Sequence, residues 1–230
     1  MKPSASSGNK GIKAVVTGGP TREWLDPVRF ISNPSSGKMG AALADAAHEL
    51  FSETVFIHGP VERSVVSGKP YRCVAVDTTR EMHDAVVKEL GDRTVLVMAA
   101  APADWAPAVK EDRKIKKSDG GMMLELVKTV DILTSIAALR ETELAASRLF
   151  VCGFAAETHD IEAYAKGKLE QKKLDMICVN DVSRTDAGFG TDTNELVLFG
   201  KDGSRMEIAN TSKSEAARRI MSIIAERIDF

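Results

Sequence analysis

The segment 17–40, TGGPTREWLDPVRFISNPSSGKMG, concentrates small and polar residues just before an expected helix. The polar residues nearest the expected helix start are Asn33, Ser35, Ser36 and Lys38, with Gly37 among them. A helix start offers free backbone N–H groups and the positive end of the helix dipole, which together bind anions. The segment therefore predicts an anion site. A cluster that only caps the helix explains these few residues equally well.

Two groups of basic residues have the charge needed to bind a polyphosphate. The first crowds one loop and comprises Lys110, Arg113, Lys114, Lys116 and Lys117. In the second, Lys168 and Lys172 are four residues apart and so share a helix face, where like charges repel by a few tenths of a kcal/mol. A bound polyphosphate would turn the repulsion between these like charges into a net attraction to the ligand. Solvated surface is the commoner explanation for either group alone.

Several nucleotide and catalytic motifs are missing from the sequence. There is no G-x-G-x-x-G, and the second expected strand ends in His58-Gly59, where a ribose-binding acidic residue would be needed. A phosphate loop is excluded because Met39 stands where Ser or Thr would bind magnesium. G-x-S-x-G and zinc-ligand spacings are also absent. A standard NAD site is disfavoured, although an NAD(P)-dependent oxidoreductase of the Rossmann type and a non-catalytic nucleotide-binding subunit remain alternatives.

Apolar periodicity alternates between strands and helices along the chain. Strands are expected over 12–17, 54–57, 71–76, 94–98, 122–126, 149–154 and 176–179, and helices over 38–50, 81–90, 131–139 and 161–173. A hairpin signal follows at 195–208, before a final amphipathic helix. The order predicts an α/β fold: a single doubly wound, Rossmann-like, mostly parallel sheet with a C-terminal hairpin. The long proline-rich loop 99–117 is a candidate working part.

Composition limits the domain count and the partners. The 230 residues are 43% hydrophobic and 28% charged, as in an ordinary globular protein. Residues 1–10 read as a disordered tail or linker remnant, and 11–230 as one domain. Because 31 basic residues face 33 acidic ones, no nucleic-acid partner is expected. The longest apolar run, 95–103, is too short to span a bilayer, so a cytoplasmic protein without a membrane partner is expected.

Six ordered blocks of the sequence resemble phosphopantothenate-cysteine ligase, also called phosphopantothenoylcysteine synthetase. They are the segment 17–40, AAAPADW (99–105) with KIKK (114–117), VKTVDI (127–132), GFAAET (153–158), KGKLEQKKLD (166–175), and NDVS with GFGTDTN (180–194). The resemblance covers essentially everything after residue 10. In bacteria this ligase is commonly fused behind a flavin-dependent decarboxylase. That half is absent from this sequence, so no FMN is expected.

The resemblance implies a two-step reaction in coenzyme A biosynthesis. A nucleoside triphosphate, CTP more than ATP, activates the carboxylate of 4'-phosphopantothenate with Mg²⁺ and releases pyrophosphate. The amine of L-cysteine then attacks the acyl-nucleotidyl intermediate, which is an acyl-cytidylate when CTP is used, and releases the nucleoside monophosphate. A homodimer is implied as well, with the 195–208 hairpin as the expected contact.

The resemblance also assigns roles to individual residues. The nucleotide-binding positions are Met98, Ala99, Ala100, Asp104, Lys114, Val127, Lys128, Thr129, Val130, Phe154, Lys168 and Lys172. Asn33 and Lys114 are the catalytic candidates. The substrate-binding candidates are Asn33 together with Ser35, Ser36 and Gly37; the last three follow from the anion site itself and would either take the substrate phosphate or orient Asn33. The magnesium ligands are not indicated. One departure is that similar enzymes read Lys-Asn-Pro-Asp-Ile where this chain has KTVDI at 128–132.

Overall fold

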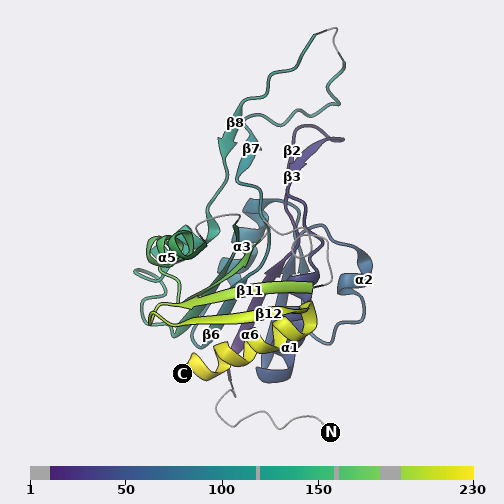
Figure 1. Ribbon diagram of the computed structural model, residues 1–230. Helices are drawn as coiled ribbons and strands as arrows, with labels where there is room; N and C mark the ends of the chain where they lie inside the picture. The colour runs from purple at the N-terminus through teal and green to yellow at the C-terminus, as the bar shows by residue number, and fades with distance from the viewer. Residues whose placement is uncertain (1–10, 118–119, 158–160, 182–192) are drawn as a thin grey trace.

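The computed structural model describes residues 11–117, 120–157, 161–181 and 193–230 (Figure 1), so the tail expected over 1–10 lies outside the described residues. An eight-stranded sheet has the order β12-β11-β10-β9-β6-β1-β4-β5. Its strands are β1 (Lys13–Gly18), β4 (Glu53–His58), β5 (Arg72–Ala75), β6 (Thr94–Met98), β9 (Leu149–Glu157), β10 (Met176–Asp181), β11 (Thr193–Gly200) and β12 (Arg205–Ser212). Strand β11 pairs antiparallel with both β10 and β12, and the other neighbouring strands of this sheet pair parallel. The predicted α/β class with a C-terminal hairpin is confirmed.

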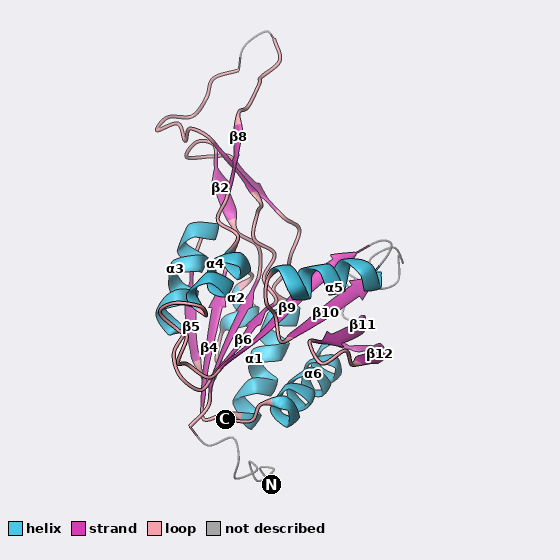
Figure 2. Ribbon diagram, turned by 90° about the vertical axis from the view of Figure 1, so that its left-hand side faces the viewer, coloured by secondary structure: helices cyan, strands magenta, loops and turns pink. Residues whose placement is uncertain are grey.

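Helices cover both faces of the sheet (Figure 2). The helices are α1 (Lys38–Leu50), α2 (Arg63–Val66), α3 (Thr79–Glu89), α4 (Ile132–Leu139), α5 (Ile161–Gln171) and α6 (Lys213–Arg227). Successive strand residues point to opposite faces, so Val16 packs in one core with α1 and α6, while Val15 packs in the other with α3, α4 and α5. None of the described helices is long and apolar enough to cross a membrane.

Local sequence signals set several of these boundaries. Helix α1 has the predicted bounds, and the capping box between Thr78 and Glu81 opens α3 as predicted. The strand predicted over 122–126 is wrong. The strand β8 (Leu126–Lys128) begins only at the last residue of the predicted range, and it pairs with β7 (Trp105–Pro107). The reason is that a strand needs a partner, and β7 offers only three residues.

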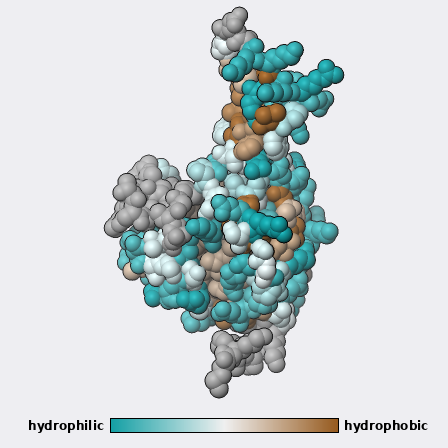
Figure 3. Space-filling view, turned by 90° about the vertical axis from the view of Figure 1, so that its right-hand side faces the viewer, coloured by the Kyte–Doolittle hydropathy of each residue, from teal (hydrophilic) through white to brown (hydrophobic). Residues whose placement is uncertain are grey.

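An arm, made of residues 22–32, 105–117 and 120–128, projects from one end of the sheet (Figure 1). It consists of two small ribbons: β2 (Arg22–Trp24) pairs with β3 (Phe30–Ser32), and β7 pairs with β8. Most large apolar side chains that stay exposed in the described chain lie on this arm, including Val109, 70% exposed, and Met123, 99% exposed. Figure 3 shows hydrophobic atoms along it. The arm therefore presents apolar surface that the domain itself does not cover.

Candidate active site

A hollow of about 350 Å³ lies where the α1 start meets the carboxyl ends of the parallel strands. Parallel α/β sheets bind their ligands at this end. The predicted site residues that line the hollow are Asn33, Ser35, Ser36, Gly37, Ala99, Ala100, Asp104, Phe154 and Lys168. The structure thus brings together predicted residues from four of the six sequence blocks, which are far apart along the chain.

The start of α1 packs directly on the end of β1. A Cβ atom on Gly40 would lie 2.7 Å from both the Gly18 Cα and the Thr17 carbonyl oxygen, so only glycine permits this approach. Gly37 is the N-cap residue, in the left-handed conformation with φ 74°, and α1 has no side-chain cap. The interpretation of the polar cluster as a simple N-cap is therefore wrong. A helix start without a side-chain cap suits an anion.

Asn33 is held against the loop that follows β6. Its Nδ2 donates to the carbonyl oxygen of Pro102 at 2.9 Å and approaches that of Ala101 at 3.5 Å. Asn33 is itself exposed. The amide therefore has a fixed direction at the rim of the hollow.

The loop after β6 is fixed by hydroxyl groups and by the chain after β8. The Thr17 hydroxyl accepts a hydrogen bond from the Ala100 N–H at 3.1 Å and lies 3.6 Å from the sulfur of Met98, which is buried. The Thr129 N–H donates to the Asp104 carbonyl at 3.0 Å, and its hydroxyl donates to Ala103 at 2.7 Å. The predicted nucleotide segments 98–104 and 127–130 are thus adjacent.

The remaining residues of the second segment differ in environment. Val130 packs against the core, whereas Val127 and Lys128 belong to β8 and are exposed on the arm. None of these three lines the hollow. The segment therefore connects the site to the arm.

The three lysines expected to bind the triphosphate occupy three different places. Lys168 lines the hollow. Lys172 pairs with Asp131 at 3.1 Å, at the N-cap of α4. Burial raises the pKa of Asp131, but the Thr134 N–H and Lys172 outweigh burial and hold that pKa below its usual range. Lys114 lines a separate hollow on the arm, so the lysines that the resemblance assigns to one triphosphate are divided between α5 and the arm.

The lining residues that the sequence did not single out include three polar ones, Asn180, Asn194 and Lys213. The Asn180 Nδ2 donates to Asn194 Oδ1 at 3.3 Å, and Asn194 is 4% exposed. Among the described residues, the buried Asn180 Oδ1 has no hydrogen-bond partner. A buried polar atom in that state is costly unless a ligand or water completes it. The sequence did contain a signal for the two asparagines, because both belong to the resemblance blocks 180–183 and 188–194. These blocks place Asn180 on β10 and Asn194 on the neighbouring strand β11.

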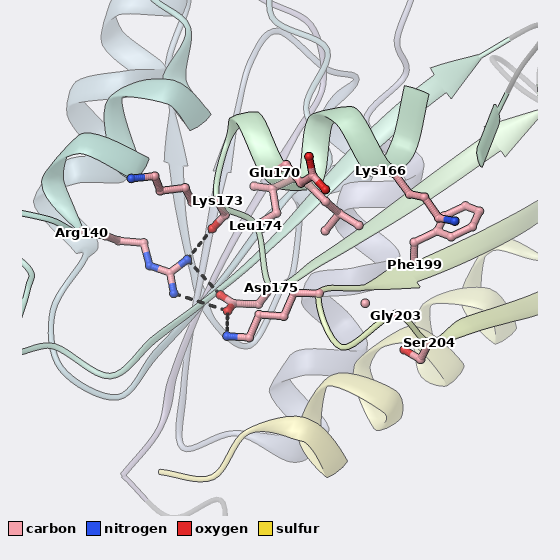
Figure 4. A pocket seen from close by; sticks show the side chains of 12 residues that line it. Arg140, Lys166, Glu170, Lys173, Leu174, Asp175, Phe199, Gly203 and Ser204 are labelled. Carbon is pink, nitrogen blue, oxygen red and sulfur yellow. Dashed lines mark hydrogen bonds and ion pairs between the residues drawn. The ribbon is translucent and has the colours of Figure 1, made fainter. Parts of the chain in front are cut away.

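A second, larger hollow of about 570 Å³ lies at the opposite, amino ends of β9 and β10 (Figure 4). Its central carboxylate, Asp175, is 5% exposed and pairs with Arg140 and Lys201. Asp175 also accepts the Val151 N–H at 2.8 Å. The charge of Asp175 is thus satisfied by Arg140 and Lys201, and no predicted site residue lines this hollow. The hollow at the carboxyl ends is therefore the candidate active site.

The family described as DNA/pantothenate metabolism flavoprotein C-terminal domain matches residues 9–228. The chain belongs to this family. Two similar curated proteins are both coenzyme A biosynthesis bifunctional protein CoaBC. The Vibrio cholerae protein is 44% identical over 220 residues, which cover 95% of this chain and 53% of the relative. The Bacillus subtilis protein is 43% identical over 216 residues, which cover 94% of this chain and 52% of the relative. The chain spans about half the length of these relatives.

Two similar solved structures share the fold. The crystal structure of the C-terminal domain of the coenzyme A biosynthesis bifunctional protein CoaBC has a TM-score of 0.73 and 33% identity, over 96% of this chain and 97% of that one. A Cab2 mutant in complex with phosphopantothenate-cysteine has a TM-score of 0.74 over 95% and 86% of the two chains. At 16% identity, that likeness shows the fold alone. The resemblance drawn from the six blocks is confirmed.

Proposed function

We propose that this chain is the ligase that joins 4'-phosphopantothenate to L-cysteine in coenzyme A biosynthesis. The substrate carboxylate attacks the α-phosphorus of a nucleoside triphosphate, CTP in preference to ATP, and pyrophosphate leaves. The cysteine amine then attacks the acyl carbon, and the nucleoside monophosphate leaves. The observation that supports this most is the fixed Asn33 amide at the rim of a hollow lined by the β6 loop, in a chain whose relatives are named for coenzyme A biosynthesis.

Activation needs charge neutralisation more than acid-base chemistry, because the substrate carboxylate is ionised near neutral pH. Three lysines line the hollow: Lys38, Lys168 and Lys213. These cations would hold the triphosphate and stabilise the charge that develops on the departing pyrophosphate. The start of α1 at Gly37, with Ser35 and Ser36, would take the substrate phosphate.

Asn33 would act in the second step. Its bond to Pro102 leaves the side-chain amide a second N–H, which can donate to the acyl oxygen as the cysteine amine attacks. One well-placed donor of this kind is worth about 3 kcal/mol in the transition state. The same fixed direction would place the acyl group beside the β6 loop.

Magnesium would enter with the nucleotide. Mg²⁺ prefers one or two carboxylates together with substrate phosphates and waters. Asp104 supplies a carboxylate to the hollow, and the described residues include no cluster of three metal-ligating side chains. Asp104 would therefore help to hold the ion, which would supply further charge neutralisation when bound.

A homodimer formed by the arm would complete the site. Lys114 lines an arm hollow and not the hollow that contains Asn33, so another copy's arm is needed to bring this cation to the triphosphate. The arm carries the exposed apolar residues that such a contact would bury, including Phe30 and Trp105. By contrast, the outer strand β12 of the 195–208 hairpin exposes mainly polar side chains. The arm is thus a better contact than the hairpin expected from the sequence.

Pyrophosphate release tests the proposal. The purified chain should release pyrophosphate only when 4'-phosphopantothenate, Mg²⁺ and a nucleoside triphosphate are all present. Cysteine should then convert the intermediate into product, and turnover with CTP should exceed turnover with ATP. Pyrophosphate release that ignores 4'-phosphopantothenate would refute the ligase, and nucleotide binding without any release would favour a non-catalytic subunit.

A further inference from the structure

The turn between β2 and β3 is built around one buried carboxylate. The side chain of Asp26 is 0% exposed. Its Oδ1 accepts the N–H groups of Val28 at 2.8 Å and of Arg29 at 2.9 Å. An aspartate that accepts backbone N–H groups two and three residues ahead stabilises a tight turn. One oxygen of Asp26 is therefore used to shape the turn itself.

The other oxygen of Asp26 joins the turn to the segment 109–117. Its Oδ2 accepts Nε of Arg29 at 3.0 Å, Nη2 of Arg29 at 2.5 Å and the N–H of Ile115 at 3.1 Å. Nη2 of Arg29 also donates to the Ile115 carbonyl at 2.8 Å. Asp26 and Arg29 thus hold both backbone polar groups of Ile115. Hydrogen bonds between ionised groups are stronger than neutral ones.

These bonds are the main attachment of the segment that carries Lys114. Every hydrogen bond from residues 109–117 to other described parts of the chain goes to the β2–β3 turn: the Ile115 pair, and the Glu111 N–H to the Leu25 carbonyl at 2.8 Å. Lys114 lies between the two attachment points, and its side chain is exposed. The turn therefore fixes the backbone on both sides of Lys114.

Asp26 stays ionised while it makes these bonds. Burial raises the pKa of Asp26, but Arg29 and the three backbone N–H donors outweigh burial and hold that pKa well below its usual range. The attachment is therefore intact over the pH range in which the enzyme would work.

We propose that Asp26, acting through Arg29, is a positioning residue for the activation step, because it holds the Lys114 segment in the shape that presents this lysine to the triphosphate. The inference rests on the proposed function, in which Lys114 neutralises the triphosphate. Asp26 itself touches no substrate. Its loss should therefore impair formation of the acyl-nucleotidyl intermediate and spare the attack of cysteine on it.

Asp26→Asn separates the two uses of this side chain. The amide oxygen can still accept from Val28 and Arg29, so the turn is kept. The amide nitrogen replaces Oδ2 and places a donor against the donors of Arg29 and Ile115. We expect the pyrophosphate burst to slow at least tenfold and KM for CTP to rise. Consumption of isolated acyl-nucleotide by cysteine should stay within twofold of the parent.

A double variant tests whether Asp26 acts through Lys114. In a Lys114→Gln background, Asp26→Asn should cause no further loss of intermediate formation. Asp202→Asn is the matched control, because Asp202 also holds a turn, accepting the Ser204 N–H at 3.0 Å, and lies in the β11–β12 hairpin. This control should leave both half-reactions unchanged. Multiplicative losses in the double variant, or equal loss of both half-reactions in Asp26→Asn, would overturn the inference.

Hydrogen exchange keeps this inference distinguishable from the proposed function. Amides of residues 111–115 should exchange faster in Asp26→Asn than in the parent or in Asp202→Asn, whatever reaction the chain catalyses. Arg29→Lys, which keeps the charge but loses the paired donors, should show the same change if Asp26→Asn does not fold. Unchanged exchange in Asp26→Asn refutes the attachment. If exchange is faster in Asp26→Asn but the parent chain releases no pyrophosphate, the attachment stands, and the ligase and with it the positioning role are refuted.

Discussion

At the residue scale, Asn33 is the side chain whose role the geometry defines most sharply. Its amide is oriented by the Pro102 carbonyl at 2.9 Å. The neighbouring serines and Gly37 line the same hollow but lack such a fixed direction among the described contacts. Asn33 was singled out from a family resemblance, and the loop after β6 supplies the physical reason for that choice.

Asn33→Asp should separate the two half-reactions. The carboxylate cannot donate to the acyl oxygen, so the intermediate should still form while its consumption by cysteine slows about 100- to 1,000-fold. Rapid quenching and chromatography of the acyl-nucleotide measure both rates. Asn210→Asp, on the exposed surface of β12, is the matched control. Equal rates of consumption in the parent and in Asn33→Asp would contradict the assigned role.

The two lysines of α5 should differ although they are four residues apart. Lys168 lines the hollow, so Lys168→Gln should lower kcat/KM for CTP about tenfold or more. Lys172 is engaged by Asp131, so Lys172→Gln should lower the free energy of unfolding by up to about 1 kcal/mol and change kcat/KM less. Steady-state kinetics and urea unfolding measure the two effects. A larger kinetic loss in Lys172→Gln would mean that α5 rearranges when nucleotide binds.

At the element scale, the amino ends of two strands are joined by an ion cluster around the buried Glu89 carboxylate, remote from the site. The Glu89 carboxylate at the end of α3 accepts from Arg72 of β5 at 2.6 Å and from Lys13 of β1 at 2.5 Å. The Arg72 hydrogen bond lowers the pKa of Glu89 most, burial opposes it, and Lys13 lowers the pKa further, to about 2. This cluster stabilises the scaffold without touching the hollow.

The Glu89 cluster predicts acid-sensitive stability. Since the folded pKa of about 2 lies below the ordinary value of 4.5, the stabilisation is complete above pH 4.5 and is lost as pH falls toward 2. Glu89→Gln should lower the free energy of unfolding by on the order of 2 kcal/mol at pH 7 and by much less near pH 2. Urea unfolding across this range measures the difference. Glu53→Gln, at an exposed carboxylate about 4 Å from the same cations, should change little.

Elements defined by local signals were predictable, whereas elements defined by distant partners were not. Gly37, apolar periodicity and the Thr78–Glu81 box were enough to locate α1 and α3. The short strands β2, β3, β7 and β8 were missed because three-residue strands depend on pairing. The candidate site divided in the same way. The α1 start and the β6 loop could be foreseen, but helical spacing could not show that Asp131 engages Lys172.

At the scale of the whole molecule, the arm separates the cation Lys114 from the hollow that contains Asn33. If the arm of one copy serves the hollow of another, two inactive variants should complement each other. Mixing Asn33→Asp with Lys114→Gln under conditions that exchange subunits should restore part of the parent activity, because one hollow in each mixed dimer is complete. Light scattering should show a dimer. A monomer, or a mixture without activity, would contradict the proposed assembly.

The transfer of a labelled oxygen tests the central claim most directly. With 4'-phosphopantothenate carrying ¹⁸O in its carboxylate, attack on the α-phosphorus leaves one labelled oxygen bridging the acyl group and the nucleotide. When cysteine displaces the nucleotide, that oxygen should appear in CMP, and mass spectrometry should find one ¹⁸O in each CMP and none in pyrophosphate. Unlabelled CMP, or label in orthophosphate, would contradict an acyl-nucleotidyl ligase.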